Sequence, residues 1–137
     1  MSDRLYADGA NFRFELDARS ILICRVWKRP DLDADTGAAL AHEMAAVWAR
    51  AGSDAAVVAG VFDLRDAPPV FGPRTEAAFR TMLERLGGKR IALLCGDNAL
   101  QRLQLQRIGA GHGAVIVTHL VEQARSHVTG ESKRPGA

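Results

Sequence analysis

One apolar stretch, at residues 55–64, constrains the fold of this chain more than any other feature. Only Gly60 and Asp63 interrupt it, and nearly continuous apolar runs are typical of a central strand that is covered on both faces. Residues at helical spacing precede and follow the run: Leu40, Met44, Val47 and Ala51 on one side, and Phe79, Met82, Leu83 and Leu86 on the other. A buried strand between two amphipathic helices predicts an α/β domain.

The remaining segments continue this alternation. Apolar and polar residues alternate at 12–16, and a second strand pattern follows at 21–27. Beyond the second helix, strand and helix patterns alternate at 90–95, 98–108, 114–118 and 121–128. The predicted order is β-β-α-β-α-β-α-β-α, which indicates a mostly parallel five-stranded sheet with an antiparallel first strand and helices on both faces.

Both ends of the chain are polar. We expect residues 1–11 to form an N-terminal arm and residues 130–137 a disordered tail, so that residues 12–129 make a single domain. A chain of 137 residues is long enough for one domain with its own core. Its N-terminus lacks the apolar segment of a signal peptide, and no apolar run approaches the roughly 20 residues of a membrane span. We therefore expect a cytoplasmic protein with no membrane span.

Charge and cysteine content narrow the classes of function. The formal net charge is +2, and the 18 lysines and arginines are interleaved with 16 acidic residues, which does not indicate a nucleic-acid partner. Cys24 and Cys95 both lie in apolar runs and form no Cys-x-x-Cys motif. We therefore expect buried thiols in a reducing compartment rather than a redox pair.

The glycine-rich segment 109–113 resembles a phosphate-binding loop. A phosphate cradle must follow a strand and open a helix, so that amide groups of the helix point at the anion. Here the glycines follow a predicted helix and precede a strand, as do Gly52, Gly87 and Gly88. Helix C-caps and tight turns explain this placement, and the sequence predicts no cofactor.

Strand-to-helix loops lie at the carboxyl ends of parallel strands, where open α/β sheets bind their ligands. The polar residues expected there include Asp63, Arg65, Asp66, Asp97 and His119. Asp63 and Arg65 are two residues apart, so their side chains share one face of the strand. Either they form a local ion pair, or they join Asp66 and Asp97 in a polar recognition site.

Neither a metal site nor a catalytic centre is predicted. The four histidines, at 42, 112, 119 and 127, show no metal-ligand spacing and no neighbouring carboxylate pair. As a general base, His119 would need a nucleophile, and only Thr118 or the buried-looking Cys95 is evident.

Segment 31–35 resembles the start of a calcium-binding loop. Thr36 at the sixth position and His42 at the twelfth break the match, because that loop needs glycine and glutamate there. Capping of the following helix by Asp33 or Asp35 is the better explanation.

Two segments suit protein contacts. Residues 67–73 contain three prolines, and Val70 and Phe71 are large apolar residues among them. They either pack over a sheet edge or dock a partner, because a stiff loop loses little entropy on binding. In the helix before the glycine-rich segment, Gln104 and Arg107 lie on or beside the apolar stripe. They either reach solvent at its margin or face another polar surface, such as a second subunit.

The order of elements, the strand end Val61-Phe62-Asp63-Leu64-Arg65 and the helix at 100–108 resemble a STAS-like domain, with the resemblance covering roughly residues 12–128. This is the fold of bacterial anti-sigma-factor antagonists and of the cytoplasmic part of sulfate transporters. The resemblance implies a non-enzymatic switch, in which a kinase phosphorylates a serine or threonine after the third strand and adds about −2 charge at an interface. Residues 65–74 contain no hydroxyl, so Thr75 is the first candidate acceptor. We expect Thr75 to cap the helix instead.

These features predict a non-catalytic, STAS-like binding module that forms homodimers or docks on a regulatory partner. The contact would involve residues 63–71 and the face that carries Gln104 and Arg107. The alternative is a small-molecule sensor or minor enzyme whose strand-end cleft is lined by His119 and Asp63. A deep cavity at the strand ends would favour the alternative, whereas an exposed apolar surface around Val70 would favour protein binding.

Overall fold

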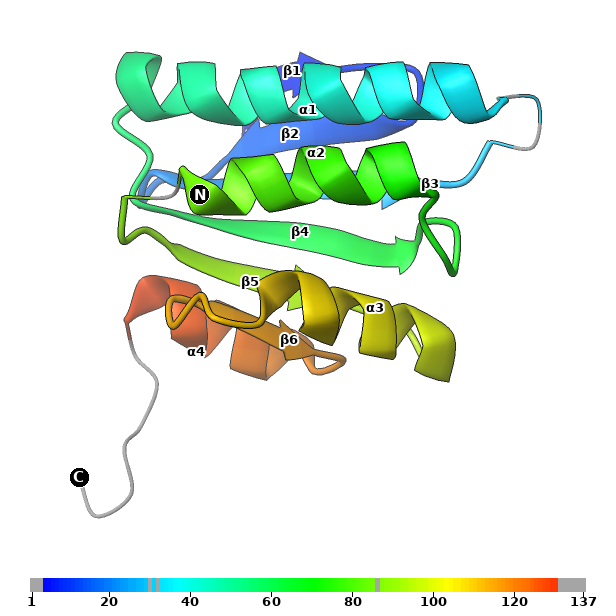
Figure 1. The fold of residues 1–137 in the computed structure, drawn as a ribbon. Helices are drawn as coiled ribbons and strands as arrows, with labels where there is room; N and C mark the ends of the chain where they lie inside the picture. The colour runs from blue at the N-terminus through cyan, green and yellow to red at the C-terminus, as the bar shows by residue number, and fades with distance from the viewer. Residues whose placement is uncertain (1–3, 30, 32, 86, 131–137) are drawn as a thin grey trace.

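The computed structural model describes residues 4–29, 31, 33–85 and 87–130, which form a six-stranded sheet and four helices (Figure 1). The strands are β1 (Arg4–Asp8), β2 (Phe12–Leu16), β3 (Ile21–Trp27), β4 (Ala59–Asp66), β5 (Arg90–Leu94) and β6 (Val115–Thr118). The helices are α1 (Ala34–Asp54), α2 (Pro73–Glu84), α3 (Ala99–Gly109) and α4 (Val121–Thr129). Among the described residues, no helix combines the length and the apolar character that crossing a membrane requires.

The strands lie in the sheet in the order in which they occur in the chain. β1, β2 and β3 pair antiparallel, and β3, β4, β5 and β6 pair parallel. Right-handed crossovers that all step in one direction bring their helices to the same face. Accordingly α1, α2 and α3 lie side by side in front of the sheet in Figure 1, while α4 packs on the other face against β4, β5 and β6.

The prediction of a mostly parallel α/β domain with helices on both faces is therefore confirmed, but the prediction of five strands is wrong. The sixth strand, β1, lies in the segment that we expected to be a polar arm. Its residues carry no clear alternation: Leu5 is 50% exposed, and the register of β1 against β2 shifts between Leu5 and Ala7. Pairing with β2 satisfies its backbone, which a side-chain pattern does not reveal. The predicted tail beyond Gly130 lies outside the described residues.

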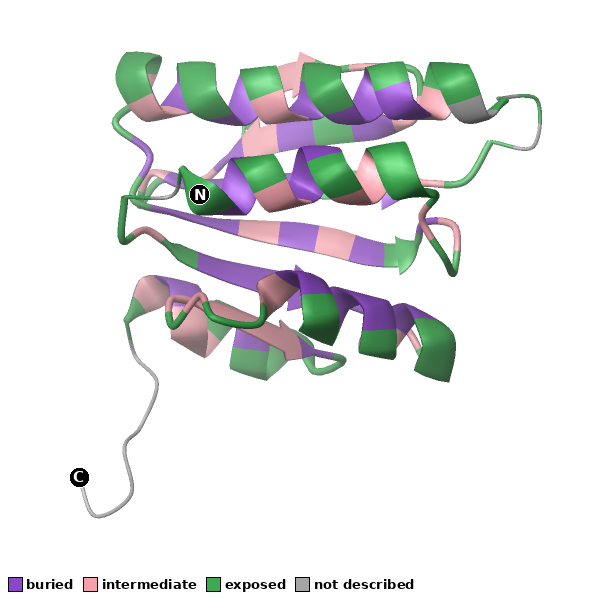
Figure 2. Cartoon of the chain, in the orientation of Figure 1, coloured by how far each residue is buried: buried purple, intermediate pink, exposed green. Residues whose placement is uncertain are grey.

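The main core lies between the sheet and the first three helices (Figure 2). Aromatic rings meet edge-on or tilted along it, and Phe62 of β4 contacts Phe14, Trp48 and Phe79. Trp48 packs directly over Gly60, where a Cβ atom would lie 2.5 Å from its ring. A second, smaller cluster under α4 contains Ile21, Ala59, Ala92, Leu94, Ala124 and Val128. The unequal covering of the two faces decides where the chain has surface left for binding.

The cap of α1 and the glycine turns lie where the sequence predicts them. Of the two candidate caps of α1, Asp33 is the one used, and its carboxylate accepts a hydrogen bond from the Thr36 amide at 2.8 Å. Gly87, Gly88 and Gly111 all have positive φ and precede β5 or β6. They lie at the amino ends of the parallel strands, so they serve as turns there rather than as a phosphate cradle.

Candidate functional site

The loop between β4 and α2, residues 67–72, is held in place by one buried side chain of α3. The Gln104 Oε1 atom accepts a hydrogen bond from the Phe71 amide at 2.7 Å, and its Nε2 atom donates to the Phe71 carbonyl at 2.9 Å. The Phe71 ring stacks on Phe79 of α2 at a centroid distance of 5.2 Å. The loop therefore has a fixed conformation although it belongs to no strand or helix.

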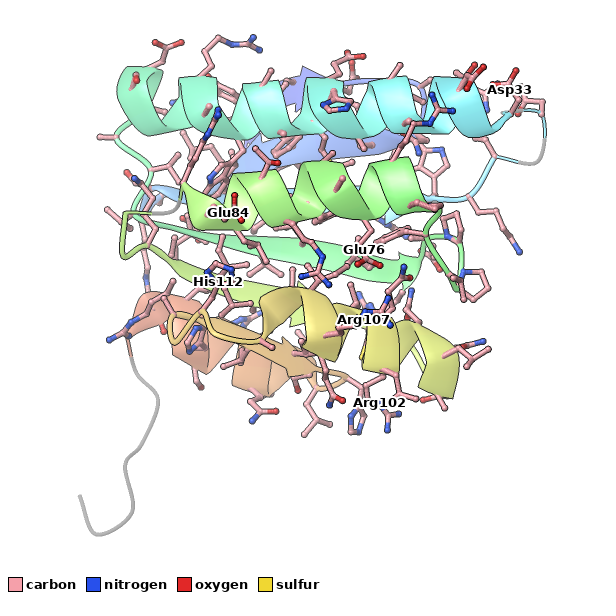
Figure 3. The ribbon with its side chains drawn as sticks, viewed as in Figure 1. Asp33, Glu76, Glu84, Arg102, Arg107 and His112 are labelled. Carbon is pink, nitrogen blue, oxygen red and sulfur yellow. The ribbon has the colours of Figure 1, made fainter. Side chains whose placement is uncertain are left out.

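Glu76 of α2 connects this anchor to the surface. Its carboxylate accepts hydrogen bonds from Gln104 at 3.0 Å, from Arg107 at 2.8 Å and from Arg80 at 2.9 Å. Figure 3 shows Glu76 and Arg107 pointing toward each other between α2 and α3. The hydrogen bonds from Gln104 and Arg107 lower the pKa of Glu76 from 4.5 to about 2. The polar surface that Gln104 and Arg107 face is thus a part of their own chain.

A second buried glutamine, which sequence reasoning did not single out, lies one turn before Gln104. The Gln101 Oε1 atom accepts from the Gly96 amide at 2.9 Å, and its Nε2 atom donates to the Leu64 carbonyl at 2.8 Å. It therefore ties together the carboxyl ends of β4 and β5. Together with Asn98, which caps α3, Gln101 fixes this helix at the strand ends.

The two glutamines take buried positions on α3 while two leucines of the same helix are exposed. Gln101 and Gln104 lie on the buried face of α3 with Leu105 and Ile108. Leu100 and Leu103 are 64% and 61% exposed. Both leucines belong to the stripe of apolar residues that the sequence indicates, and only the tertiary partners of the glutamines reveal which face is buried.

Of the large apolar side chains exposed at the carboxyl end of the sheet, three lie in this loop and in α3. Val70, at the tip of the anchored loop, is 52% exposed, and Leu100 and Leu103 follow on α3. We call these three residues the loop–α3 patch. The Gln104–Phe71 hydrogen bonds connect the two elements that carry it. Val70 and Phe71 thus have different roles: one is exposed, and the other is half-buried against α2.

Asp63 and Arg65 form the ion pair that their spacing indicates. The Arg65 guanidinium donates to both Asp63 carboxylate oxygens, at 2.9 and 2.7 Å. Partial burial alone would raise the pKa of Asp63, but the hydrogen bonds from the Arg65 side chain and backbone outweigh it and lower the pKa. Asp66 pairs instead with Arg25 of β3 at 3.2 Å.

The structure does not bring all the predicted site residues together. Asp63 and Arg65 line a cleft beside α4, and neither Asp66, Asp97 nor His119 lines it. Asp97 and His119 are exposed in the loops after β5 and β6. The polar recognition site predicted from Asp63, Arg65, Asp66 and Asp97 is thus divided between separate ion pairs and an exposed loop.

Thr75 is not the helix cap that we expected. α2 begins at Pro73 with Gly72 as its N-cap, and no side chain caps it. Thr75 lies in the first turn, half-buried, beside a pocket of about 110 Å³ that Phe71 and Phe79 also line. Proline suits the first helical position because no hydrogen-bond donor is needed there.

The remaining candidates concern metal and thiol chemistry. Within the described residues, no group of three or more His, Cys, Asp or Glu side chains is placed to hold a metal ion. Cys24 and Cys95 are both buried and unpaired.

Comparisons of the chain with protein-family models, with curated proteins and with solved structures found no match.

Proposed function

We propose that the chain is a cytoplasmic, non-catalytic binding module of the STAS-like type that its sequence resembles, and that it forms a homodimer through the loop–α3 patch. The observation that carries this proposal is the exposure of two leucines on α3, a helix whose buried face carries two glutamines. On the buried face Gln104 anchors the 67–72 loop, while Leu100 and Leu103 are exposed on the same helix. An apolar surface on a rigid support is what a docking site requires.

The rigidity of the loop favours association. Ordering a flexible loop or side chain on binding costs about 0.5–1.5 kcal/mol for each immobilised group. The Gln104 hydrogen bonds and the stacking of Phe71 on Phe79 already order this loop in the single chain. Val70 can therefore contribute its buried area to an interface with little further entropic loss.

The surroundings of the patch fit the ordinary anatomy of an interface, in which an apolar centre is bordered by polar groups. Glu76, Arg80 and Arg107 form an ion-pair network that spans α2 and α3 beside it. A surface with both signs of charge around an apolar centre can be complementary to itself about a two-fold axis. This supports a second copy of the chain as the partner.

The alternative, a ligand site at the strand ends, has less support. The pocket beside the loop has a volume of about 110 Å³, whereas small-molecule sites usually occupy about 300–1,000 Å³. His119 is exposed and does not line it. Asp63, the other residue of this alternative, lines a separate cleft beside α4, and His119 does not line that cleft either, so the two residues form no shared site.

Sedimentation velocity over a range of protein concentrations tests the proposal. We expect wild type to sediment as a dimer, and Val70→Asp and Leu103→Asp to shift it to monomer. Val58→Asp is the matched control, because Val58 is 57% exposed but precedes β4 at the opposite end of the sheet. A wild type that stays monomeric, or a dimer that tolerates the patch variants as well as Val58→Asp, would overturn the proposal.

A further inference from the structure

A larger cleft lies on the opposite face of the sheet, between the β3–β4 surface and α4. Its volume is about 580 Å³, within the usual range for small-molecule sites. It is lined by Asp17, Arg19, Ile21, Ile23, Val61, Asp63, Arg65, Leu94, Val121, Ala124, Arg125, Val128 and Thr129. None of the loop–α3 patch residues lines it, so it is a separate surface.

The cleft exists because α4 is too short to cover this face. α4 has 9 residues and packs against β4, β5 and β6. β3 and β4 are nonetheless the two middle strands of the sheet and pair parallel, and such strands ordinarily have both faces covered. Ile23 and Val61 lie next to each other on these strands and are only partly buried. Two β-branched side chains in the middle of the sheet are therefore left for another apolar group to cover.

The floor of the cleft is apolar throughout. Ile21 and Leu94 are each 3% exposed and continue the surface on either side of Ile23 and Val61. Ala124 and Val128 of α4, also buried, form the wall, and Val121 at the start of α4 is 40% exposed. The apolar surface still available to a short aliphatic chain or a single aromatic ring is that of Ile23, Val61 and Val121.

The rim of the cleft carries an excess of positive charge. Three arginines, Arg19, Arg65 and Arg125, lie against two aspartates, and both carboxylates are already engaged. Asp17 accepts hydrogen bonds from the amides of Arg19 and Ile21 at 2.8 and 3.0 Å, and Asp63 is paired with Arg65.

One of these arginines, Arg125, has no side-chain partner in the part of the chain that the structure describes. Arg125 is exposed on α4, and its side chain has no hydrogen bond or ion pair to any residue that the structure describes. The guanidinium presents five donors in a planar fork that matches a carboxylate. The unused hydrogen-bond donors of Arg125 therefore carry a positive charge and suit an anionic group.

We propose that this cleft binds a small carboxylate with an apolar body, such as a short fatty acid or an aromatic acid. The body lies over Ile23 and Val61, and the carboxylate pairs with Arg125 at the rim. Binding here does not depend on the loop–α3 patch. It would give the module a ligand-responsive face on the side of the sheet opposite to its docking surface.

Titration of the labelled protein with hexanoate and with benzoate, followed by amide NMR shifts, tests this site. We expect saturable shifts at Ile23, Val61 and Ala124, with hexanol, benzyl alcohol and hexylamine binding at least tenfold more weakly. Arg125→Gln should weaken carboxylate binding about tenfold, which corresponds to about 1.4 kcal/mol. Arg50→Gln is the control, because Arg50 is an equally surface-placed arginine at the end of α1.

The outcomes are distinct. Saturable carboxylate binding at the cleft that Arg125→Gln weakens and Arg50→Gln preserves supports the proposal. Absence of saturable binding, shifts confined to another surface, or equal affinity for the amine or the alcohol overturns it. Because the patch variants are assayed by sedimentation and the cleft by titration, either proposal can fail while the other holds.

Discussion

Gln104 hydrogen-bonds to both backbone groups of Phe71, a residue 33 positions earlier in the chain. The side-chain amide of Gln104 thereby satisfies backbone hydrogen bonds of the loop, as a neighbouring strand would in a sheet. It is placed on the buried face of α3, so the same contact decides which face of that helix is exposed. The conformation of the loop and the exposure of Leu103 are thus two results of one interaction.

Replacing Gln104 by leucine should destabilise the protein by about 2 kcal/mol, because it leaves the Phe71 amide and carbonyl without a partner. Chemical denaturation followed by circular dichroism measures the change. Gln106→Leu on the exposed side of the same helix is the control and should alter stability by less than about 0.5 kcal/mol. Equal effects of the two substitutions would contradict the anchoring role of Gln104.

Glu76 should make stability depend on pH in the acid range. Its folded-state pKa of about 2 lies below its ordinary 4.5, so the carboxylate stabilises the fold fully above pH 4.5 and loses this effect as the pH falls toward 2. The stability difference between wild type and Glu76→Gln should therefore be largest at neutral pH and shrink over this interval. A difference that does not change with pH would refute the assignment.

Two glycine-to-alanine substitutions should act in opposite directions. At Gly60 the new Cβ atom would lie 2.5 Å from the Trp48 ring and 3.3 Å from the Leu22 carbonyl oxygen, so we expect a loss of about 1–3 kcal/mol. At Gly37, within α1, it would meet no atom within 4 Å, and alanine should stabilise the helix by about 0.5–1 kcal/mol. Thermal unfolding of both variants measures the two shifts, and a stabilising Gly60→Ala would mean that Trp48 packs elsewhere.

Both cysteines should be inert in the folded protein. Cys24 and Cys95 are each 1% exposed. Burial, together with the nearby negative charge of Asp63, raises the pKa of the Cys24 thiol and so disfavours the reactive thiolate. A disulfide reagent such as DTNB should therefore label neither thiol under native conditions and both after denaturation. Rapid native labelling would show that the β3 surface opens to solvent.

The sequence predicted the elements well wherever a periodic pattern coincided with burial. The run that contains Phe62 and Leu64 is the central strand β4, and the helical spacing of Met44, Val47 and Trp48 marks the buried face of α1. β1 was not predicted, because its few residues are half-exposed and show no clear alternation. Short edge strands owe their structure to backbone pairing, which leaves little trace in side-chain composition.

The candidate site was less accessible to prediction. The oddity of a polar residue at position 104 is visible in the sequence, and so is the Asp63–Arg65 spacing. The partner of Gln104 is a backbone segment far away in the chain, and the choice of buried face in α3 depends on it. Local periodicity carries no information about such a contact, so the exposure of Leu100 and Leu103 was not foreseen.

The strand order has a consequence for how the protein is made. Each strand from β2 onward pairs with the strand that leaves the ribosome just before it. No strand has to be inserted between two that have already paired, and each step closes over a single turn or helix. The antiparallel β1–β2 and β2–β3 pairs close over short turns, whereas each parallel pair spans a helix and closes more slowly. The sheet can therefore grow during synthesis from the N-terminal hairpin outward. Each new parallel strand pairs with the edge strand formed just before it.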